Sequence, residues 1–189
     1  MPVQTQARSD EDLLTGEELL ARPDVGPAEL VEGRIVPTSY TNCEHAEIVG
    51  DLAYELNRFV REHGVDGTVF AGDAGLYTRR DPDTVRGVDV AFISNERLAD
   101  NTAETLLDAA PELIVEVISP ANSWEGVRRK IGEYFAIGTE RVWIIEPANR
   151  SALVFTAPDA MRALEAGDQL DGEGRLDGFA LPVTSLFDA

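Results

Sequence analysis

The chain has 189 residues, of which 43% are hydrophobic, enough to bury one substantial core. Its formal net charge is −19, from 35 acidic and 16 basic residues, which argues against a broad electrostatic grip on a polyanion. The single cysteine, Cys43, excludes an internal disulfide, and the two histidines have no thiol partners at the spacing of a zinc site.

The N-terminal sequence predicts no targeting segment. No apolar run approaches the roughly 18 residues that a membrane span needs, and the first residues lack the apolar core of a signal peptide. We therefore expect a cytoplasmic protein without membrane contact. Residues 1–10 are predicted to be a disordered leader, and residues 11–189 a single domain.

Local signals near the start of this domain predict a short helix, a hairpin and a long helix. Thr15 followed by Glu18 forms a capping-box signature for the short helix. Residues 28–39 predict a hairpin whose polar turn includes Glu32. The long helix is capped by Gly64, and its apolar residues at helical spacing are Ile48, Val49, Leu52, Leu56, Phe59 and Val60.

Strands dominate the rest of the chain. They are predicted at 67–72, 74–79, 88–93 and 113–118. A loop with one helical turn occupies 95–111, the segments RVWIIEP and ALVFTA predict a hairpin, and short edge strands follow from Gln169 onward. This order indicates an α/β (α+β mixed) fold, in which helices flank a mixed β-sheet with extra hairpins.

The only lysine, Lys130, lies on the inward face of a predicted helix. In SWEGVRRKIGEYFAIGTE, the helical period places an apolar arc at Trp124, Val127, Ile131, Tyr134, Phe135 and Ile137. Lys130 falls inside this arc, whereas Arg128 and Arg129 point elsewhere. A charge directed at a core usually meets a carboxylate or an anion, so Lys130 predicts an ionic partner inside the protein.

Two carboxylates interrupt apolar strands and are the candidates for that partner. Glu116 lies in PELIVEVISP, and Asp89 lies in GVDVAFIS. Buried carboxylates cost several kcal/mol unless they are paired or bound to a metal. Two carboxylates, a backbone carbonyl and water are the oxygen ligands that Mg²⁺ or Mn²⁺ takes, so the pattern indicates a metal site.

Several segments together resemble one nuclease family. VDVAFIS, APELIVEVISP and SWEGVRRKIGEYFAIGTERVWIIEP are similar to the Uma-type restriction endonucleases of the PD-(D/E)XK nuclease superfamily. LVEGRIVPTS and EHAEIVGDL extend the resemblance over roughly residues 28–155 and part of the tail. It implies a restriction-endonuclease-like core and metal-dependent hydrolysis of phosphodiester bonds in DNA.

The resemblance also implies a catalytic centre. Asp89 and Glu116 would bind Mg²⁺ or Mn²⁺ with help from the main-chain carbonyl of Val117, and Lys130 would orient or activate the attacking water or stabilise the transition state. In the superfamily the lysine more often follows the Glu by two residues, where this chain has Ile118. A lysine on the following helix is the pattern of the Uma-type family.

Other positions bear on this centre less directly. Val88 replaces the usual proline before the Asp, which removes no ligand. Glu32 matches an acidic position of the family near the site, and Tyr134 lies one turn beyond Lys130, so both are candidate supporting residues. His45, alone near the start of the long helix, is interpreted as a packing or helix-terminus residue.

The acidic charge leaves other functions open. DNA binding is expected to be weak and salt-sensitive unless a homodimer groups the arginines. One alternative is a catalytically inactive nuclease-fold protein that serves as an acidic interaction module, although an inactive site has no reason to keep two buried carboxylates. Another is a magnesium-dependent hydrolase of a small phosphorylated substrate.

Overall fold

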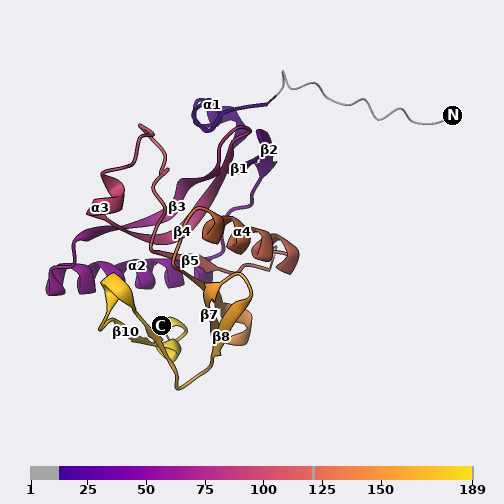
Figure 1. Cartoon of the computed structure of the whole chain (residues 1–189). Coiled ribbons are helices and arrows are strands. Elements are labelled where there is room, and N and C mark those ends of the chain that lie inside the picture. The colour runs from indigo at the N-terminus through magenta and orange to yellow at the C-terminus, as the bar shows by residue number, and fades with distance from the viewer. Residues whose placement is uncertain (1–12, 121, 189) are drawn as a thin grey trace.

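A mixed β-sheet with helices on both faces forms the core of the computed structural model, which describes residues 13–120 and 122–188 (Figure 1). The leader predicted at residues 1–10 lies outside the described residues. The helices are α1 (Gly16–Leu20), α2 (Cys43–His63), α3 (Asn95–Leu98) and α4 (Trp124–Ala136). This architecture confirms the predicted fold class.

The sheet has the strand order β2-β1-β4-β5-β6-β7-β8, and β3 pairs with β4. The strands are β1 (Ala28–Val31), β2 (Arg34–Pro37), β3 (Gly67–Arg79), β4 (Thr84–Ser94), β5 (Leu113–Val117), β6 (Arg141–Glu146), β7 (Ser151–Ala157) and β8 (Ala160–Leu164). The strands β5 and β6 run parallel and are joined through α4, because a parallel pair needs a crossover connection. A separate two-stranded sheet contains β9 (Gln169–Asp171) and β10 (Ala180–Pro182).

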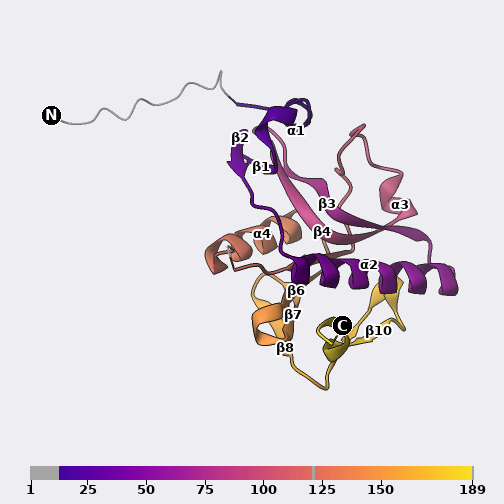
Figure 2. The same cartoon turned by 180° about the vertical axis from the view of Figure 1, so that it is seen from behind.

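Helices α2 and α4 cover opposite faces of the sheet (Figures 1 and 2). On one face α2 buries Ile48, Leu52 and Leu56, and the small sheet of β9 and β10 joins the same apolar cluster. On the other face α4 buries Val127 and Ile131. The predicted apolar arcs of both helices are therefore the faces that pack, and they hold the two helices against the strands that carry Asp89 and Glu116.

Two strand predictions differ from the structure. The strands predicted at 67–72 and 74–79 form one strand, β3, because a bulge between Ala71 and Ala74 lets the pairing with β4 continue. Strand β8 was not predicted, since most of its residues are exposed and show no alternation of apolar and polar side chains. The predicted edge strands after Gln169 are β9 and β10.

Helix α2 begins at an asparagine cap. The Oδ1 atom of Asn42 accepts a hydrogen bond of 2.8 Å from the backbone N–H of His45. Replacing Asn42 with alanine is expected to lower the free energy of unfolding by about 1 kcal/mol, because a backbone donor loses its partner. Urea denaturation measures this change, with Glu47→Ala on the exposed face as the control; equal effects of the two substitutions would contradict the cap.

Candidate active site

The site lies at an opening in the sheet along one edge of β4. The strand β3 pairs with β4 from end to end, so β1 and β5 share the opposite edge. The strand β1 meets this edge at the pair Leu30 and Val85, and β5 meets it from the pair Val90 and Val115 onward. Between them, residues 86–89 have no strand partner on this edge within the described part of the chain. The opening leaves the edge of β4 without a β-ladder here, although the side chains of Arg86, Val88 and Asp89 stay buried.

Asp89 spans this opening. One carboxylate oxygen accepts a hydrogen bond of 2.7 Å from the backbone N–H of Val117. The pairing of β4 with β5 does not extend to Val117, so this N–H has no partner in the β4 backbone. The other oxygen lies 3.1 Å from Nε2 of His45, on the first turn of α2. The hydrogen bond to Asp89 raises the pKa of His45 against the opposing effect of burial. His45 thus contacts a carboxylate 44 residues away, beyond the local packing role predicted for it.

Glu116 projects from β5 toward α4 and meets both predicted partners there. Nζ of Lys130 lies 3.3 Å from Oε2 of Glu116, and the hydroxyl of Tyr134 donates a hydrogen bond to Oε1. Burial raises the pKa of Glu116 to about 7, since the negative charge of Asp89 adds to it and the attraction of Lys130 only partly offsets it. The inward direction inferred for Lys130 and Tyr134 from the helical period agrees with these contacts.

A second glutamate, Glu29, was missed by the sequence analysis. Its Oε1 atom lies 2.8 Å from Nζ of Lys130, closer than Glu116 does, and its Oε2 atom accepts a hydrogen bond of 2.8 Å from Arg86. Arg86 also makes two hydrogen bonds of 2.7 Å with the carboxylate of Glu133 on α4. The available signal was a charged residue inside the strand-like segment AELV; Arg86 gave none, because β4 begins at Thr84, before the predicted start at residue 88. The buried charges thus form one continuous network.

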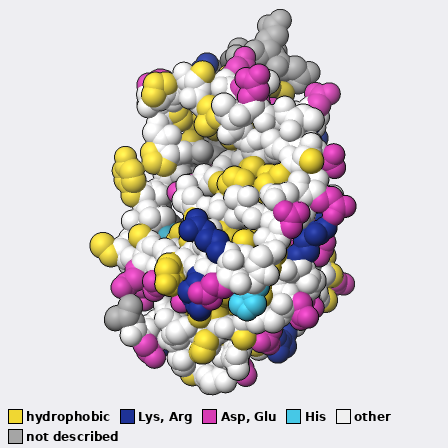
Figure 3. All heavy atoms as spheres, turned by 90° about the vertical axis from the view of Figure 1, so that its left-hand side faces the viewer, with side chains coloured by type: hydrophobic (Ala, Val, Ile, Leu, Met, Phe, Trp, Pro, Cys, Tyr) yellow, Lys and Arg dark blue, Asp and Glu magenta, His cyan; other side chains and the backbone are white. Residues whose placement is uncertain are grey.

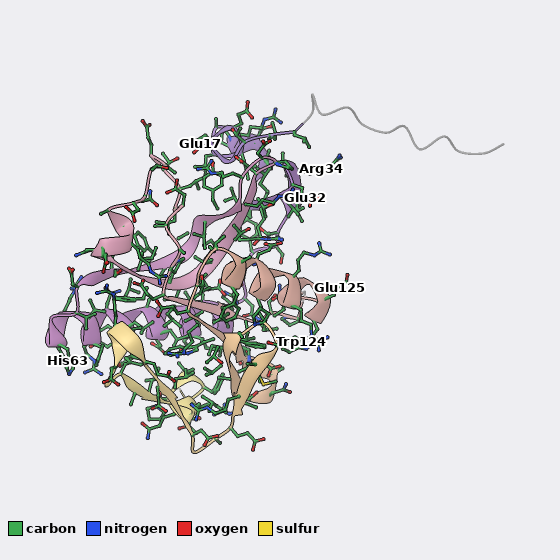
Figure 4. The ribbon with its side chains drawn as sticks, viewed as in Figure 1. Glu17, Glu32, Arg34, His63, Trp124 and Glu125 are labelled. Carbon is green, nitrogen blue, oxygen red and sulfur yellow. The ribbon has the colours of Figure 1, made fainter. Side chains whose placement is uncertain are left out.

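Glu32 does not join this network. It lies in the turn between β1 and β2 with φ at 51°, next to Gly33 at 73°, and both values belong to a tight hairpin turn. Its side chain is 64% exposed and pairs with Arg79 at 2.9 Å. Figure 4 shows Glu32 at the hairpin end beside Arg34. Glu29, three residues earlier, is the acidic side chain of this hairpin that contacts Lys130.

Two cavities meet at these residues. A groove of about 950 Å³ is lined by Asp89, Glu116, Val117 and Lys130, together with His45. A smaller cavity of about 290 Å³, which we call the side pocket, lies between the β1–β2 hairpin and α4. The side chains of Glu29, Glu116 and Lys130 line both cavities, so they stand at the junction between them.

The acidic lining of the groove has the chemistry of a site for a hard cation. Four carboxylates and one lysine line it: Glu29, Asp73, Asp89, Glu116 and Lys130. Burial, and then the charge of Asp89, raise the pKa of Asp73. Within residues 13–120 and 122–188, no three His, Cys, Asp or Glu side chains already converge as a metal cage. Carboxylates and main-chain carbonyls are the kinds of ligand that Mg²⁺ or Mn²⁺ takes, and Asp89, Glu116 and Val117 supply such groups to the lining of the groove.

Comparison with known proteins identifies the family. The model of the Uma2 family, described as "Putative restriction endonuclease", matches residues 17–184. The chain belongs to this family. The Uma2 match spans Glu29, His45, Asp89, Glu116 and Lys130, and it supports a nuclease-like, hydrolytic function. It also confirms the resemblance seen in the sequence.

A solved structure supports the fold of this Uma2 member. The crystal structure at 1.96 Å of "a putative nuclease belonging to DUF820" from Anabaena variabilis ATCC 29413 has a TM-score of 0.74 and 19% sequence identity, and the match covers 90% of this chain and 96% of that chain. At this identity the likeness shows a shared fold. No curated protein matches the chain. No described helix is long and apolar enough to cross a membrane.

The raised pKa of Glu116 predicts a pH dependence of stability in the absence of metal. Its pKa rises from 4.5 to about 7 on folding, so the folded protein binds more protons than the unfolded chain between these values. Stability contributed by this group is therefore lost as the pH rises from about 4.5 to about 7. We expect the free energy of unfolding of the wild type to fall across this window relative to Glu116→Gln.

Urea denaturation in the presence of a chelator tests this difference. Glu125→Gln, at an exposed position on α4, is the matched control and should follow the wild type at every pH. Parallel curves for the wild type and Glu116→Gln would contradict the shift.

Proposed function

We propose that this Uma2-family protein is a metal-dependent endonuclease that hydrolyses phosphodiester bonds in DNA. The observation that carries the proposal is the meeting of Asp89, Glu116 and Lys130, from β4, β5 and α4, at one groove beside an opening in the sheet. Asp89, Glu116 and the carbonyl of Val117 are the proposed ligands of Mg²⁺ or Mn²⁺. When bound, the ion would lower the pKa of a bound water and neutralise charge that develops on the phosphoryl oxygens.

Lys130 is proposed to act as a positive charge and not as a base. Burial disfavours its ammonium form, but the carboxylates of Glu116 and Glu29 outweigh burial and raise its pKa above the ordinary range. An ammonium that keeps its proton can donate hydrogen bonds to a phosphoryl oxygen or to the attacking water. The neighbouring hydroxyl of Tyr134 holds Glu116 from the other side and thereby fixes its orientation.

The charge of the protein limits how DNA can be bound. On the face shown in Figure 3, the Lys and Arg side chains form separate spots among Asp and Glu side chains, and the chain carries a net charge of −19. Binding through phosphate contacts alone is then weak and falls with salt. We propose that a homodimer groups these spots, which sedimentation at low and moderate salt would detect.

The test is conversion of supercoiled plasmid to nicked or linear DNA by the wild-type protein at low salt, with Mg²⁺, Mn²⁺ or a chelator. Low salt lengthens the range of the few favourable charges. We expect cleavage with either metal and none with the chelator. Cleavage that persists in the chelator would contradict metal dependence, and no cleavage under any condition would contradict the nuclease itself.

A further inference from the structure

The side pocket opens directly onto the proposed catalytic centre. It shares four lining residues with the groove, namely Glu29, Glu116, Asn122 and Lys130. A phosphate held in the groove at Lys130 and Glu116 would therefore have its own nucleoside within reach of the pocket. No step of the proposed hydrolysis uses this second cavity.

Apolar residues form part of the lining of the side pocket, alongside the charged side chains of Glu29, Arg86 and Glu116. Val31 and Val36 of the hairpin face Val127 and Ile131 of α4 across it, and Ile144 of β6 contributes from the sheet. Apolar surface with polar groups at defined positions is typical of sites for small ligands. The pocket is open at Val36, whose side chain is 41% exposed, so it differs from a sealed packing defect in a core.

Polar groups stand at the rim of the pocket. The hydroxyl of Ser123, at the start of α4, accepts a hydrogen bond from the N–H of Gly126 and keeps its own proton to donate. The Oδ1 atom of Asn122 accepts hydrogen bonds from Ser119. Arg129 is largely exposed and pairs only loosely with Glu125, at 3.7 Å. The hydroxyl of Ser123 and the guanidinium of Arg129 can donate hydrogen bonds to the polar edge of a heterocycle whose faces lie against the apolar lining residues.

The size of the pocket limits what it can hold. Its volume of about 290 Å³ lies at the lower end of the range of small-ligand sites, so it suits one nucleoside and excludes a base pair. A protein with a net charge of −19 gains little from phosphate contacts, whereas burial of one base adds affinity that does not depend on charge. Burial of one base would thus add binding affinity that phosphate contacts cannot give to this acidic chain.

We propose that the side pocket binds one unpaired nucleoside of the substrate, with the attached phosphate at Lys130 and at the metal ion that Asp89 and Glu116 would hold. The inference rests on the proposed nuclease function and names its substrate class: single-stranded DNA, or duplex from which a mismatched nucleotide is extruded. Mismatched and single-stranded bases cost least to unstack, so they are the preferred occupants. A free nucleoside monophosphate has the same chemistry and is the other source of this ligand.

The experiment blocks the pocket without altering the catalytic residues. Val36→Trp places a large side chain at its mouth, and because Val36 is 41% exposed on an edge strand, the core is not disturbed. Met161→Trp on β8, at a position 53% exposed, is the matched control. Val36→Phe is a smaller second block, and thermal melts of all variants establish that they fold.

Initial rates of cleavage are measured on a single strand, a perfect duplex and a duplex with one mismatch. We expect the wild type and Met161→Trp to cleave the first and third at least about 10-fold faster than the perfect duplex. In Val36→Trp and Val36→Phe this preference should disappear through a rise in KM for the single strand and the mismatched duplex. Equal rates of the wild type on all three substrates, or an unchanged preference in the blocked variants, would overturn the inference.

A calorimetric titration of dAMP or dTMP with Mg²⁺ separates this inference from the nuclease proposal. If the wild type cleaves no DNA but binds the nucleotide, and Val36→Trp does not, the pocket is supported with a free nucleotide as its ligand, while the nuclease proposal fails. If DNA is cleaved but neither nucleotide nor unpaired base is preferred, the nuclease stands and the pocket inference fails. Absence of both cleavage and nucleotide binding would overturn both.

Discussion

Asp89→Asn and Lys130→Ala are each expected to lower the rate of metal-dependent plasmid cleavage by at least about 100-fold. Asparagine has nearly the same shape as aspartate and can still accept the hydrogen bond from Val117, so its effect reports on the lost charge at the metal site. Lys130→Ala removes the ammonium that faces Glu29 and Glu116. Rates at saturating metal measure both changes.

Glu32→Gln and Arg128→Ala are the matched controls for these substitutions. Glu32 is the acidic residue that the sequence suggested, but its side chain pairs with Arg79 in the hairpin turn. Arg128 is a charged neighbour of Lys130 on the same helix. Both controls should cleave at the wild-type rate, and a Lys130→Ala protein as active as they are would remove Lys130 from the mechanism.

Arg86→Met is expected to lower the free energy of unfolding by about 3–5 kcal/mol. The side chain of Arg86 is 7% exposed and holds both Glu29 and Glu133. Methionine fills a similar volume, but it leaves two carboxylates in a largely buried setting without their shared partner. Urea denaturation of the metal-free protein measures the loss.

Arg162→Met provides the comparison for Arg86→Met at the surface. Arg162 is 60% exposed and lies 3.8 Å from Asp171, so its loss should change the free energy of unfolding by less than about 1 kcal/mol. Arg86→Lys keeps the charge but not the two parallel hydrogen bonds to Glu133, and it should recover only part of the lost stability. If Arg86→Met is no more harmful than Arg162→Met, the network contributes little to the fold.

The meeting of Asp89, Glu116 and Lys130 could be predicted because each of these residues disturbs a local pattern. Asp89 and Glu116 interrupt apolar strands, and Lys130 falls inside the apolar arc of a helix. Strand alternation and the helical period act over a few residues, so a single sequence reveals where they are broken. The same locality explains why α2 ends at the cap Gly64 that the sequence predicts.

The rest of the site depends on contacts between distant segments. Glu29 looks like an ordinary polar residue of an edge hairpin until the register with β4 brings it to Arg86 and Lys130. His45 is a helix-start residue by every local measure, and its contact with Asp89 requires the packing of α2 on the sheet. Within the β1–β2 hairpin, the sequence suggested Glu32, whereas Glu29 is the residue that contacts Lys130. Contacts between distant segments decide between the two, and one sequence does not reveal them.

The β1–β2 hairpin meets β4 through one registered strand pair, Leu30 and Val85, above the opening in the sheet. Ion pairs of Glu29 with Arg86 and Lys130 hold it against β4 and α4. A phosphate that draws Lys130 toward the groove therefore competes with Glu29 for the same ammonium. Under the proposed mechanism, binding of substrate and attachment of the hairpin would therefore be coupled through the ammonium group of Lys130.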